Sequence, residues 1–196
     1  MKKIKKVVLI QPNMKWMDWN WKTNWDIHPL NLCLLGAMIQ NDYEVSVVDA
    51  NLENYTQEQF KKAISDLDPD LVGLTLLTNE YSEVAHIGAQ LVREVDPQIV
   101  TVLGGVYATV SYGSIYNDSN FDYICVGEGE YSFPQLLKYL NSEGEFPKEG
   151  FLGRREGELQ DSSKVIRTLI EDLDALPFPA WELVNYSRYT KRVGKI

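Results

Sequence analysis

Two kinds of hydrophobic pattern alternate along the chain. Short runs rich in β-branched residues are typical of strands buried on both faces of a sheet, and they lie at 5–11, 44–50, 70–77, 98–105 and 122–128. Longer stretches with apolar positions three or four residues apart are typical of helices, and they lie at 29–40, 57–67, 80–95, 108–116 and 130–144. Each predicted strand is therefore followed by a predicted helix.

Repeated strand and helix pairs predict an α/β fold: an open five-stranded parallel sheet with helices on both faces. We expect the strand order 2-1-3-4-5, because right-handed crossovers then cover both faces of the sheet. The pattern ends near Gly144. Residues 151–163 are interpreted as a hairpin with polar turns, and 171–184 as an extended segment punctuated by prolines. We therefore predict an α/β domain over 1–144, followed by an extension and linker over 145–196.

The composition is that of a soluble folded protein. The 196 residues are 44% hydrophobic and 24% charged, which fits one well-packed domain. No apolar run approaches the ~18 residues of a membrane span, so no membrane partner is expected. The basic start of the chain precedes an apolar run of only about five residues, which predicts a first strand rather than a signal peptide.

Charge and cysteine usage exclude further classes of protein. The formal net charge of −9 disfavours a nucleic-acid partner, because that binding depends on Lys and Arg neutralising phosphates. Cys33 and Cys125 lie in apolar stretches, which predicts buried thiols in a reducing compartment and a cytoplasmic protein. The chain has no CxxC and only two histidines, so it predicts neither a zinc nor an iron–sulfur site of its own.

Ligands of open parallel sheets bind beyond the carboxyl ends of the strands. No GxGxxG follows the first strand, and no P-loop motif occurs. Asn13 and Thr75 stand where a phospho-acceptor domain would carry aspartates. His28 and His86 have no evident catalytic partner and are interpreted as helix-boundary or surface residues. We therefore identify no catalytic residue.

Small residues and hydroxyls follow the central strands. Thr75 and Thr78 end the third strand, and Gly104-Gly105 ends the fourth. A residue without a Cβ lets a bulky group approach the main chain. In the alternative interpretation the glycine pair forms a tight turn and Thr78 caps a helix.

The loop after the fifth strand carries the sequence GEGE at 127–130. Its glycines leave backbone N–H groups free to face the same crevice, although Glu130 is also a favourable acid for a first helical turn. Three such loops on neighbouring strands predict a long slot for an elongated, mostly neutral ligand. Four tryptophans after the first strand, Trp16, Trp19, Trp21 and Trp25, predict partner contact, ligand cover or local packing.

At this point the residues carry a resemblance. The chain resembles the N-terminal cobalamin-binding domain of B12-dependent radical S-adenosylmethionine (SAM) enzymes, the group of anaerobic magnesium-protoporphyrin IX monomethyl ester cyclase. The similar stretches lie at 28–51, 68–81, 100–110, 121–137 and 170–181.

The resemblance implies a Rossmann-like, flavodoxin-like cobalamin-binding fold. In that fold the nucleotide tail, with its dimethylbenzimidazole and single phosphate, inserts beside the sheet, and the corrin lies across the strand ends. The predicted cofactor-binding residues are Thr75, Leu77, Thr78, Gly104, Gly105, Val106, Tyr107, Ala108, Gly127, Glu128, Gly129 and Glu130.

Two departures and one further missing motif refine this expectation. The DxHxxG motif, whose histidine ligates cobalt in the methionine-synthase type, is absent here, so the resemblance implies base-off cobalamin without a histidine ligand. Tyr107 stands where relatives frequently carry histidine. The CxxxCxxC triad that holds the 4Fe-4S cluster and serves SAM is also absent. The chain is therefore expected to be non-catalytic alone, in a parent methyltransferase or cyclase whose C-terminal radical SAM domain contacts the Trp16–Trp25 loop.

Two other functions stay open on the sequence. The domain could keep the fold without the cofactor, as an interaction or substrate-gating module that uses the tryptophan loop. It could also bind a flavin or nucleotide in the flavodoxin manner, which is the weaker alternative because no hydroxyl-rich phosphate loop follows the first strand.

Overall fold

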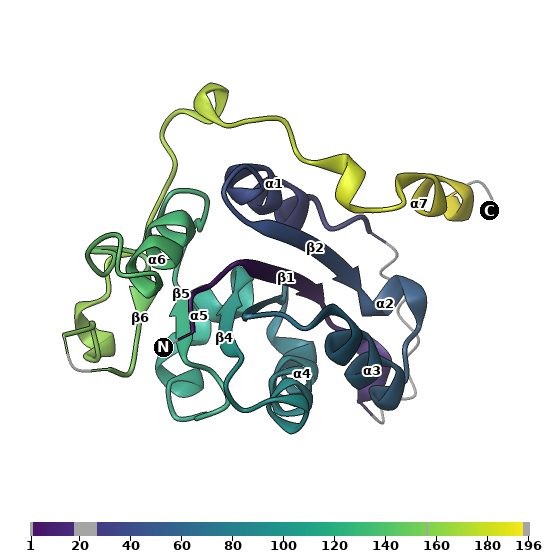
Figure 1. Cartoon of the computed structure of the whole chain (residues 1–196), viewed down its shortest axis with the longest axis horizontal. Helices are drawn as coiled ribbons and strands as arrows, with labels where there is room; N and C mark the ends of the chain where they lie inside the picture. The colour runs from purple at the N-terminus through teal and green to yellow at the C-terminus, as the bar shows by residue number, and fades with distance from the viewer. Residues whose placement is uncertain (1, 18–26, 156, 194–196) are drawn as a thin grey trace.

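Six strands form a single sheet in the part of the chain that the computed structural model describes, residues 2–17, 27–155 and 157–193 (Figure 1). Their order is β2-β1-β3-β4-β5-β6. They are β1 (Lys6–Gln11), β2 (Glu44–Asp49), β3 (Leu71–Thr75), β4 (Val100–Gly104), β5 (Tyr123–Cys125) and β6 (Phe151–Leu152). The first five run parallel, so the predicted order 2-1-3-4-5 is confirmed.

The prediction of five strands is wrong by one. β6 pairs antiparallel with β5, placing Leu152 opposite Ile124 and Phe151 opposite Cys125. Two residues are too few to show a strand period in the sequence. The predicted hairpin over 151–163 has this short strand as its first arm. Its chain then turns back through a hydrogen bond from Gly153 N to Leu159 O, at 3.0 Å.

Helices follow the strands as the periodicity predicts. They are α1 (Leu30–Ile39), α2 (Ala50–Glu53), α3 (Gln57–Leu67), α4 (Ser82–Val95), α5 (Gly105–Ile115), α6 (Ser132–Leu140) and α7 (Tyr186–Val193). Short 3-10 turns are η1 (Met14–Trp16), η2 (Asn79–Tyr81), η3 (Ser162–Lys164), η4 (Leu173–Ala175) and η5 (Trp181–Leu183). None of the described helices is both long and apolar enough to cross a membrane.

Local signals explain where helices begin and end. Thr56 and Gln59 form a reciprocal capping box at the start of α3, and α4 ends at Val95, just before Asp96 and Pro97. α5 differs from the predicted helix at 108–116 because it begins directly at Gly105, with no loop after β4. This junction brings the first turn of α5 to the carboxyl edge of the sheet.

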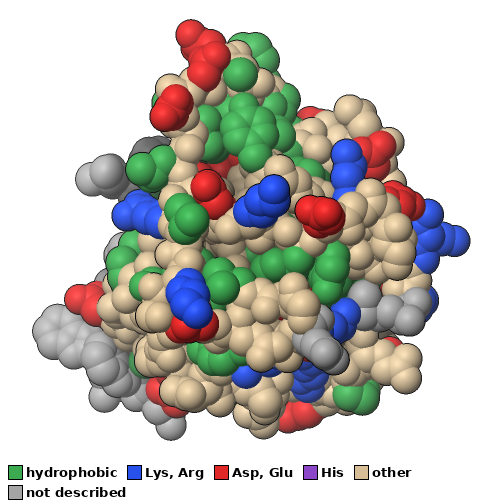
Figure 2. Space-filling model, turned by 90° about the vertical axis from the view of Figure 1, so that its left-hand side faces the viewer, with side chains coloured by type: hydrophobic (Ala, Val, Ile, Leu, Met, Phe, Trp, Pro, Cys, Tyr) green, Lys and Arg blue, Asp and Glu red, His purple; other side chains and the backbone are tan. Residues whose placement is uncertain are grey.

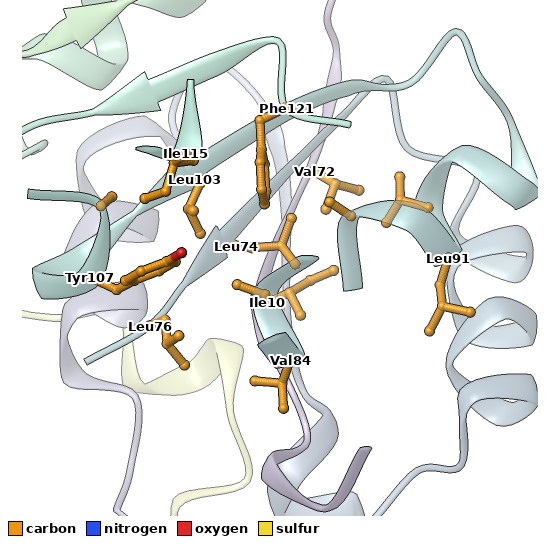
Figure 3. Close-up of a cluster of buried hydrophobic side chains, with 14 of the residues drawn as sticks. Ile10, Val72, Leu74, Leu76, Val84, Leu91, Leu103, Tyr107, Ile115 and Phe121 are labelled. Carbon is orange, nitrogen blue, oxygen red and sulfur yellow. The ribbon is translucent and has the colours of Figure 1, made fainter. Parts of the chain in front are cut away.

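The two faces of the sheet have separate cores. Side chains of α3, α4 and α5 pack on one face with Leu74, Leu103 and Phe121 (Figure 3). α1 and α6 cover the opposite face, where Leu9 and Val102 are buried, and Figure 1 shows these two helices on the other side of the sheet from α3 and α4. The site described below lies on the α1/α6 face.

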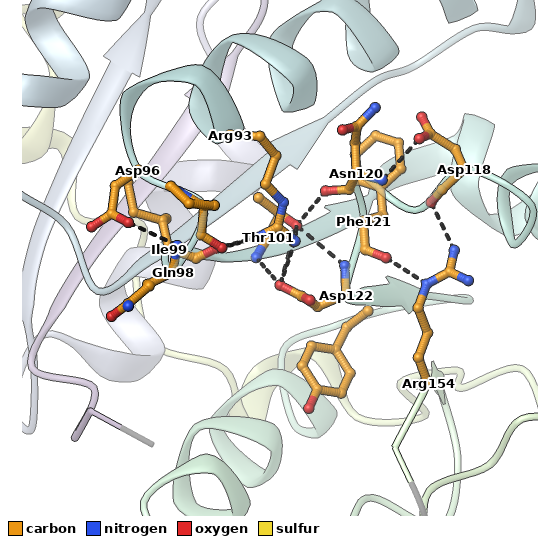
Figure 4. A network of polar contacts seen from close by, with 12 residues as sticks. Arg93, Asp96, Gln98, Ile99, Thr101, Asp118, Asn120, Phe121, Asp122 and Arg154 are labelled. Carbon is orange, nitrogen blue, oxygen red and sulfur yellow. Dashed lines mark hydrogen bonds and ion pairs between the residues drawn. The ribbon is translucent and has the colours of Figure 1, made fainter.

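Polar side chains close the amino-terminal ends of the strands (Figure 4). The Arg93 guanidinium donates to the carbonyl of Ile99 at 2.7 Å, to Thr101 Oγ1 at 2.9 Å and to Asp122 Oδ2 at 2.8 Å. Arg154 donates to the carbonyls of Phe121 and Asp118, both at 2.7 Å. Each of these donors has its acceptor, so this edge of the sheet is held by satisfied hydrogen bonds.

The residues after Gly144 pack against the α/β domain. Thr168 forms a parallel bridge with Gly127, and the N–H of Ala180 donates to the carbonyl of Cys33 at 3.0 Å. Farther along, Tyr189 Oη donates to Asp49 Oδ2 at 2.8 Å. In Figure 1 the yellow-green to yellow part of this segment crosses above α1 and ends in α7 near β2. The extension is thus in contact with the domain at several places.

Of the predicted tryptophan loop, the structure accounts for Trp16. Its ring packs edge-on against Phe60, with ring centroids 4.9 Å apart, and its Nε1 donates to the Tyr55 carbonyl at 2.9 Å. Local packing therefore explains Trp16. Trp19, Trp21 and Trp25, on which the predicted partner contact also depends, lie outside the described residues.

Candidate functional site

Small residues occupy the α1/α6 face of the central strands toward their carboxyl ends. Successive side chains of a strand point to opposite faces, so this face receives Gly73 and Thr75 from β3, Gly104 from β4 and Cys125 from β5. Their neighbours on the other face are large and buried, as Figure 3 shows for Leu74 and Leu103. Large side chains therefore fill one face of the sheet, whereas the small residues of the other face leave space above the strands.

A cavity of about 350 Å³ lies over these small residues. Its floor is Leu9, Gly73, Thr75, Val102, Gly104 and Cys125 from the sheet. Its walls are Asn31, Leu32 and Leu35 from α1, Phe133 from α6, and the first turns of α5. The volume lies within the ~300–1,000 Å³ of small-molecule sites. The cavity is therefore a slot beside the sheet that opens at the carboxyl ends of the strands.

Two glycines make the room in this cavity. Gly104 has an extended backbone, with φ at −130°, and a Cβ built on it would have Cys125 Cβ as its nearest neighbour, at 3.7 Å. At Gly73 a Cβ would meet only the end of the Leu9 side chain, at 3.0 Å. Both positions could carry a side chain without backbone strain, and that side chain would occupy the cavity.

Two other glycines of the predicted site are required by the backbone of the chain itself. Gly105 has φ at +89°, and a Cβ there would lie 2.6 Å from the carbonyl oxygen of Leu76. Gly127 has φ at +98°, and a Cβ would overlap the carbonyl of Thr168. The alternative interpretation of a tight turn therefore describes Gly105 well.

Neutral polar groups line the mouth of the cavity. Asn31 Nδ2 donates to Thr75 Oγ1 at 2.8 Å, which links α1 to the end of β3. Thr109 Oγ1 donates to the carbonyl of Gly105 and accepts from the N–H of Gly127, both at 3.0 Å. Thr109 thereby fixes the loop after β5 against the first turn of α5.

The acidic residues of the GEGE loop differ in their surroundings. One carboxylate oxygen of Glu128 accepts a hydrogen bond from the N–H of Ile170. One carboxylate oxygen of Glu130 is buried without a hydrogen-bond partner among the described residues. Burial raises the pKa of the Glu130 carboxyl, and the charge of Glu128 raises it further. Burial also raises the pKa of the neighbouring Cys125 thiol to about 12, so this wall favours neutral groups.

The structure brings nine of the twelve predicted residues together around the cavity. They are Thr75, Leu77, Gly104, Gly105, Val106, Gly127, Glu128, Gly129 and Glu130. Three lie elsewhere. Thr78 caps η2 through the N–H of Glu80, at 3.3 Å, while Tyr107 and Ala108 are buried in the core on the other face of the sheet.

Helical geometry explains where the α5 residues lie. Val106, Thr109 and Val110 are three and four residues apart, so they share the helix face that lines the cavity. Tyr107 and Ala108 point to the opposite core. Sequence reasoning missed Thr109 and Val110, although extending the helical period from Val106 would have found both.

Other lining residues carried no signal in the sequence. Asn31, Leu32 and Leu35 lie in a helix that is apolar on most sides. Arg167 comes from the extension and is the sole basic side chain among the described residues that line this cavity. The position of Arg167 at the cavity depends on how the extension packs against the sheet, which the local sequence does not indicate.

Both histidines lie away from the cavity. The His28 ring packs near Trp181, with ring centroids 5.3 Å apart. The interpretation of His86 as a helix-boundary or surface residue is wrong, because it lies inside α4, is partly buried and has two side-chain partners. Its Nδ1 lies 2.5 Å from Asp118 Oδ2 and its Nε2 lies 2.9 Å from Tyr107 Oη. These partners occupy its two ring nitrogens on the filled face of the sheet.

A larger hollow, about 620 Å³, lies between α6 and the extension. Its lining mixes both signs, with Lys138 and Lys148 beside Glu128, Glu145 and Glu149. Figure 2 shows the face of the molecule over α6 and the extension, on which acidic and basic side chains are interspersed with hydrophobic ones. Its electrostatics favour no class of ligand.

An α/β sheet whose strand ends open into a small-molecule cavity defines a ligand-binding domain. The family model of the B12 binding domain matches residues 22–137, more than half of the chain, and the chain therefore belongs to the B12-binding domain family. Binding of cobalamin is the property that this family implies.

Curated relatives agree with the resemblance seen in the sequence. The chain is 30% identical to the anaerobic magnesium-protoporphyrin IX monomethyl ester cyclase of Rubrivivax gelatinosus over 176 residues, which are 87% of this chain and 30% of that protein. It is 27% identical to the uncharacterized methyltransferase PH0819 of Pyrococcus horikoshii over 165 residues, 82% of this chain and 35% of that one. The chain thus spans about a third of the length of these relatives.

Solved structures share the fold. The cobalamin-dependent SAM radical enzyme OxsB, with aqua-cobalamin and SAM bound, superposes with a TM-score of 0.71 at 18% identity, covering 97% of this chain and 25% of that one. The radical SAM methyltransferase TsrM from Kitasatospora setae gives 0.64 at 18% identity, covering 79% and 29%.

Proposed function

We propose that the chain binds cobalamin base-off, with the nucleotide tail of the cofactor in the cavity beside the sheet and the corrin across the strand ends. In this proposal it is the cofactor domain of a longer radical SAM enzyme. The observation that carries the binding mode is the cavity over Gly73 and Gly104, which is open at the carboxyl ends of the strands.

The lining suits a flat, neutral aromatic base. Leu32, Leu35, Val102 and Phe133 supply apolar surface, and Gly104 leaves its side-chain volume free. Burial of a benzimidazole against such surface contributes roughly 25 cal/mol for each Å² removed from water. The residues present therefore fit the tail of the cofactor.

The mouth of the cavity suits the amide-bearing edge of a corrin. The side chains of Asn31 and Thr75 offer both donors and acceptors. Leu77, Val106 and Val110 line the cavity and are 42%, 51% and 59% exposed. Exposed apolar side chains of this kind favour a large, partly apolar ligand over a free surface.

Neither histidine is among the residues that line the cavity: the His28 ring packs near Trp181, and His86 pairs with Tyr107 of the core on the opposite face of the sheet. This supports base-off binding without a histidine ligand from this chain. When bound, cobalamin supplies a cobalt centre that can carry a methyl group. The chain's own residues bind and orient it and keep water from its buried base.

The parent activity is proposed from the relatives, among which are a cyclase and a methyltransferase. No CxxxCxxC motif occurs in this sequence, so the 4Fe-4S cluster and SAM would belong to another part of such an enzyme. Within that enzyme, the chain would hold cobalamin for a methyl-transfer or cyclisation reaction performed elsewhere.

Hydroxocobalamin binding tests the proposal. The purified chain is mixed with hydroxocobalamin and desalted, and we expect retained cofactor with a base-off absorbance spectrum. Gly104→Val should weaken binding about tenfold or more, because filling a packed site costs ~1–3 kcal/mol. Gly113→Val is the size-matched control, since a Cβ at Gly113 meets nothing within 4 Å.

Four results would count against this proposal. A spectrum that stays base-on would remove the binding mode. Loss of all cobalamin on desalting would favour a cofactor-free interaction module, and retention of FMN in its place would favour a flavin binder. Equal weakening by the Gly104 and Gly113 variants would show that the cavity floor does not hold the tail.

A further inference from the structure

The extension contributes a charge to the cavity. Residues matched by the family model end at 137, yet Arg167, thirty residues beyond, lines the cavity with the residues of the sheet. It is the one basic side chain among the described lining residues. A positive charge at this place is therefore supplied by a segment that the family match does not include.

Backbone hydrogen bonds fix the segment on both sides of Arg167. The N–H of Gly150 donates to the Ile166 carbonyl at 2.8 Å. The N–H of Thr168 donates to the Val126 carbonyl at 3.3 Å, and the N–H of Glu128 donates to the Thr168 carbonyl at 3.1 Å. The position of Arg167 is thus set by the strand-like pairing of 166–168 with the loop after β5.

The side chain of Arg167 lies across Gly127. A Cβ on Gly127 would lie 2.8 Å from Arg167 Cγ, so the absence of a side chain there makes room for the arginine stem. Arg167 is exposed, and its guanidinium makes no hydrogen bond or ion pair with another described residue. An unpaired guanidinium carried by a fixed backbone segment is suited to an anionic ligand.

The nearby acidic groups leave this charge free. The Glu128 carboxylate accepts from the N–H of Ile170, and Glu130 has one oxygen buried without a partner in the described part of the chain. Burial raises the pKa of Glu130, which favours its neutral form. Cys125, the other titratable group of this wall, is a buried thiol.

We propose that Arg167 binds the phosphodiester of the cofactor's nucleotide tail, so that the extension completes the cobalamin site. This rests on the proposed function, in which the tail occupies the cavity. The phosphodiester carries the negative charge of that tail, and a guanidinium can bind its two free oxygens through paired N–H donors. Docking of the extension and binding of the cofactor are then coupled.

A pair of corrinoids isolates this contact. Cobalamin carries the nucleotide tail, whereas cobinamide lacks the phosphodiester, the ribose and the base. Dissociation constants for both are measured by equilibrium dialysis with the unmodified chain, Arg167→Gln, Arg167→Lys and the control Lys164→Gln. Lys164 is exposed, pairs with Asp161 at 3.1 Å and does not line the cavity.

We expect Arg167→Gln to weaken cobalamin about tenfold, the order for loss of one charge-assisted pair, and to leave cobinamide unchanged. Arg167→Lys should lie between, because lysine keeps the charge but loses the paired donors. Lys164→Gln should match the unmodified chain. Hydrogen exchange of the amides at 166–170 should slow when cobalamin binds the unmodified chain, and should slow less in Arg167→Gln.

The inference is overturned if Arg167→Gln binds cobalamin as the unmodified chain does, or if it weakens both corrinoids equally. Failure of the proposed function looks different, because the unmodified chain would then bind cobalamin no better than cobinamide. The inference is supported if Arg167→Gln loses about tenfold in affinity for cobalamin but not for cobinamide. In that variant, cobalamin should also protect the amides at 166–170 from exchange less than it does in the unmodified chain.

Discussion

The two faces of the same sheet are built differently at their carboxyl ends. On the α4/α5 face, Leu74, Leu103 and Tyr107 fill the space between strands and helices (Figure 3). On the α1/α6 face, the alternate positions are Gly73 and Gly104, and a cavity remains. Since neighbouring residues of a strand face opposite ways, a strand can complete one core while leaving the other open.

This difference shows that a binding site can form where glycines replace the large side chains of a packed core. A filled interior packs at the density of organic crystals, and a void loses contacts on one side. The open face therefore contributes less to stability than the filled face until a ligand occupies it. The fold supplies rigidity from one face and binding capacity from the other.

The two ends of the strands show a second contrast. At the amino-terminal ends, the polar atoms of Arg93 and Asp122 are paired (Figure 4). At the carboxyl ends, the Arg167 guanidinium has no ion pair to another described residue, and Glu130 keeps a buried oxygen without a partner among those residues. Satisfied groups stabilise the sheet, whereas unsatisfied ones are available to a ligand.

The largest expected effect tests the contrast between faces directly. Leu103→Ala should lower the free energy of unfolding by about 2–5 kcal/mol, because it opens a cavity in a filled core. Cys125→Ala on the other face should cost only ~1 kcal/mol, since the thiol already borders free space. Urea unfolding of both variants without cofactor measures the difference. Equal losses would mean that both faces are equally packed.

An intermediate effect on stability tests the amino-terminal ends of the strands, where polar groups are paired. Asp70 is 5% exposed at its side chain. Burial alone would raise its pKa, but hydrogen bonds from Lys2 and from the N–H groups of Lys5 and Lys6 lower it overall. The stabilisation is therefore present above the ordinary carboxyl pKa of 3.8 and is lost as pH falls through the folded-state pKa.

Asp70→Asn should accordingly destabilise the chain by about 1–3 kcal/mol at pH 7, with the difference from the unmodified chain vanishing in strong acid. Unfolding followed at several pH values gives the comparison. Asp66→Asn is the control, because its ion pair with Lys62 is exposed and is worth ~0–1 kcal/mol. A loss for Asp70→Asn that is independent of pH would contradict the ion pair as its cause.

The smallest expected effect on stability concerns Glu130, at the carboxyl ends of the strands. Because the folded-state pKa of Glu130 lies above the ordinary value of 4.5, stability falls as pH rises from 4.5 through that pKa. Glu130→Gln should remove this fall and stabilise the chain at pH 7 by ~1 kcal/mol. Thermal unfolding across this pH range tests it. Destabilisation at pH 7 would mean that the ionised carboxylate makes a favourable contact.

Sequence reasoning located the carboxyl edge of the sheet but not the depth of the site. Gly104 and the loop at 127–130 could be predicted because they follow recognisable strands. Gly73 lies inside a strand, where its importance depends on which face it meets. The helix residues Tyr107 and Ala108 were expected at the ligand and lie in the opposite core, because the rotation of α5 is set by packing.

By itself the sequence determined the succession of strands and helices, which follows from local periodicity, and a parallel strand order that right-handed crossovers favour. It also carried the resemblance to cobalamin domains. Tertiary structure alone decided that β6 joins the sheet, that α1 and α6 leave a cavity between them, and that Arg167 reaches it. Each of these depends on contacts between residues far apart in the chain, whose geometry no local pattern records.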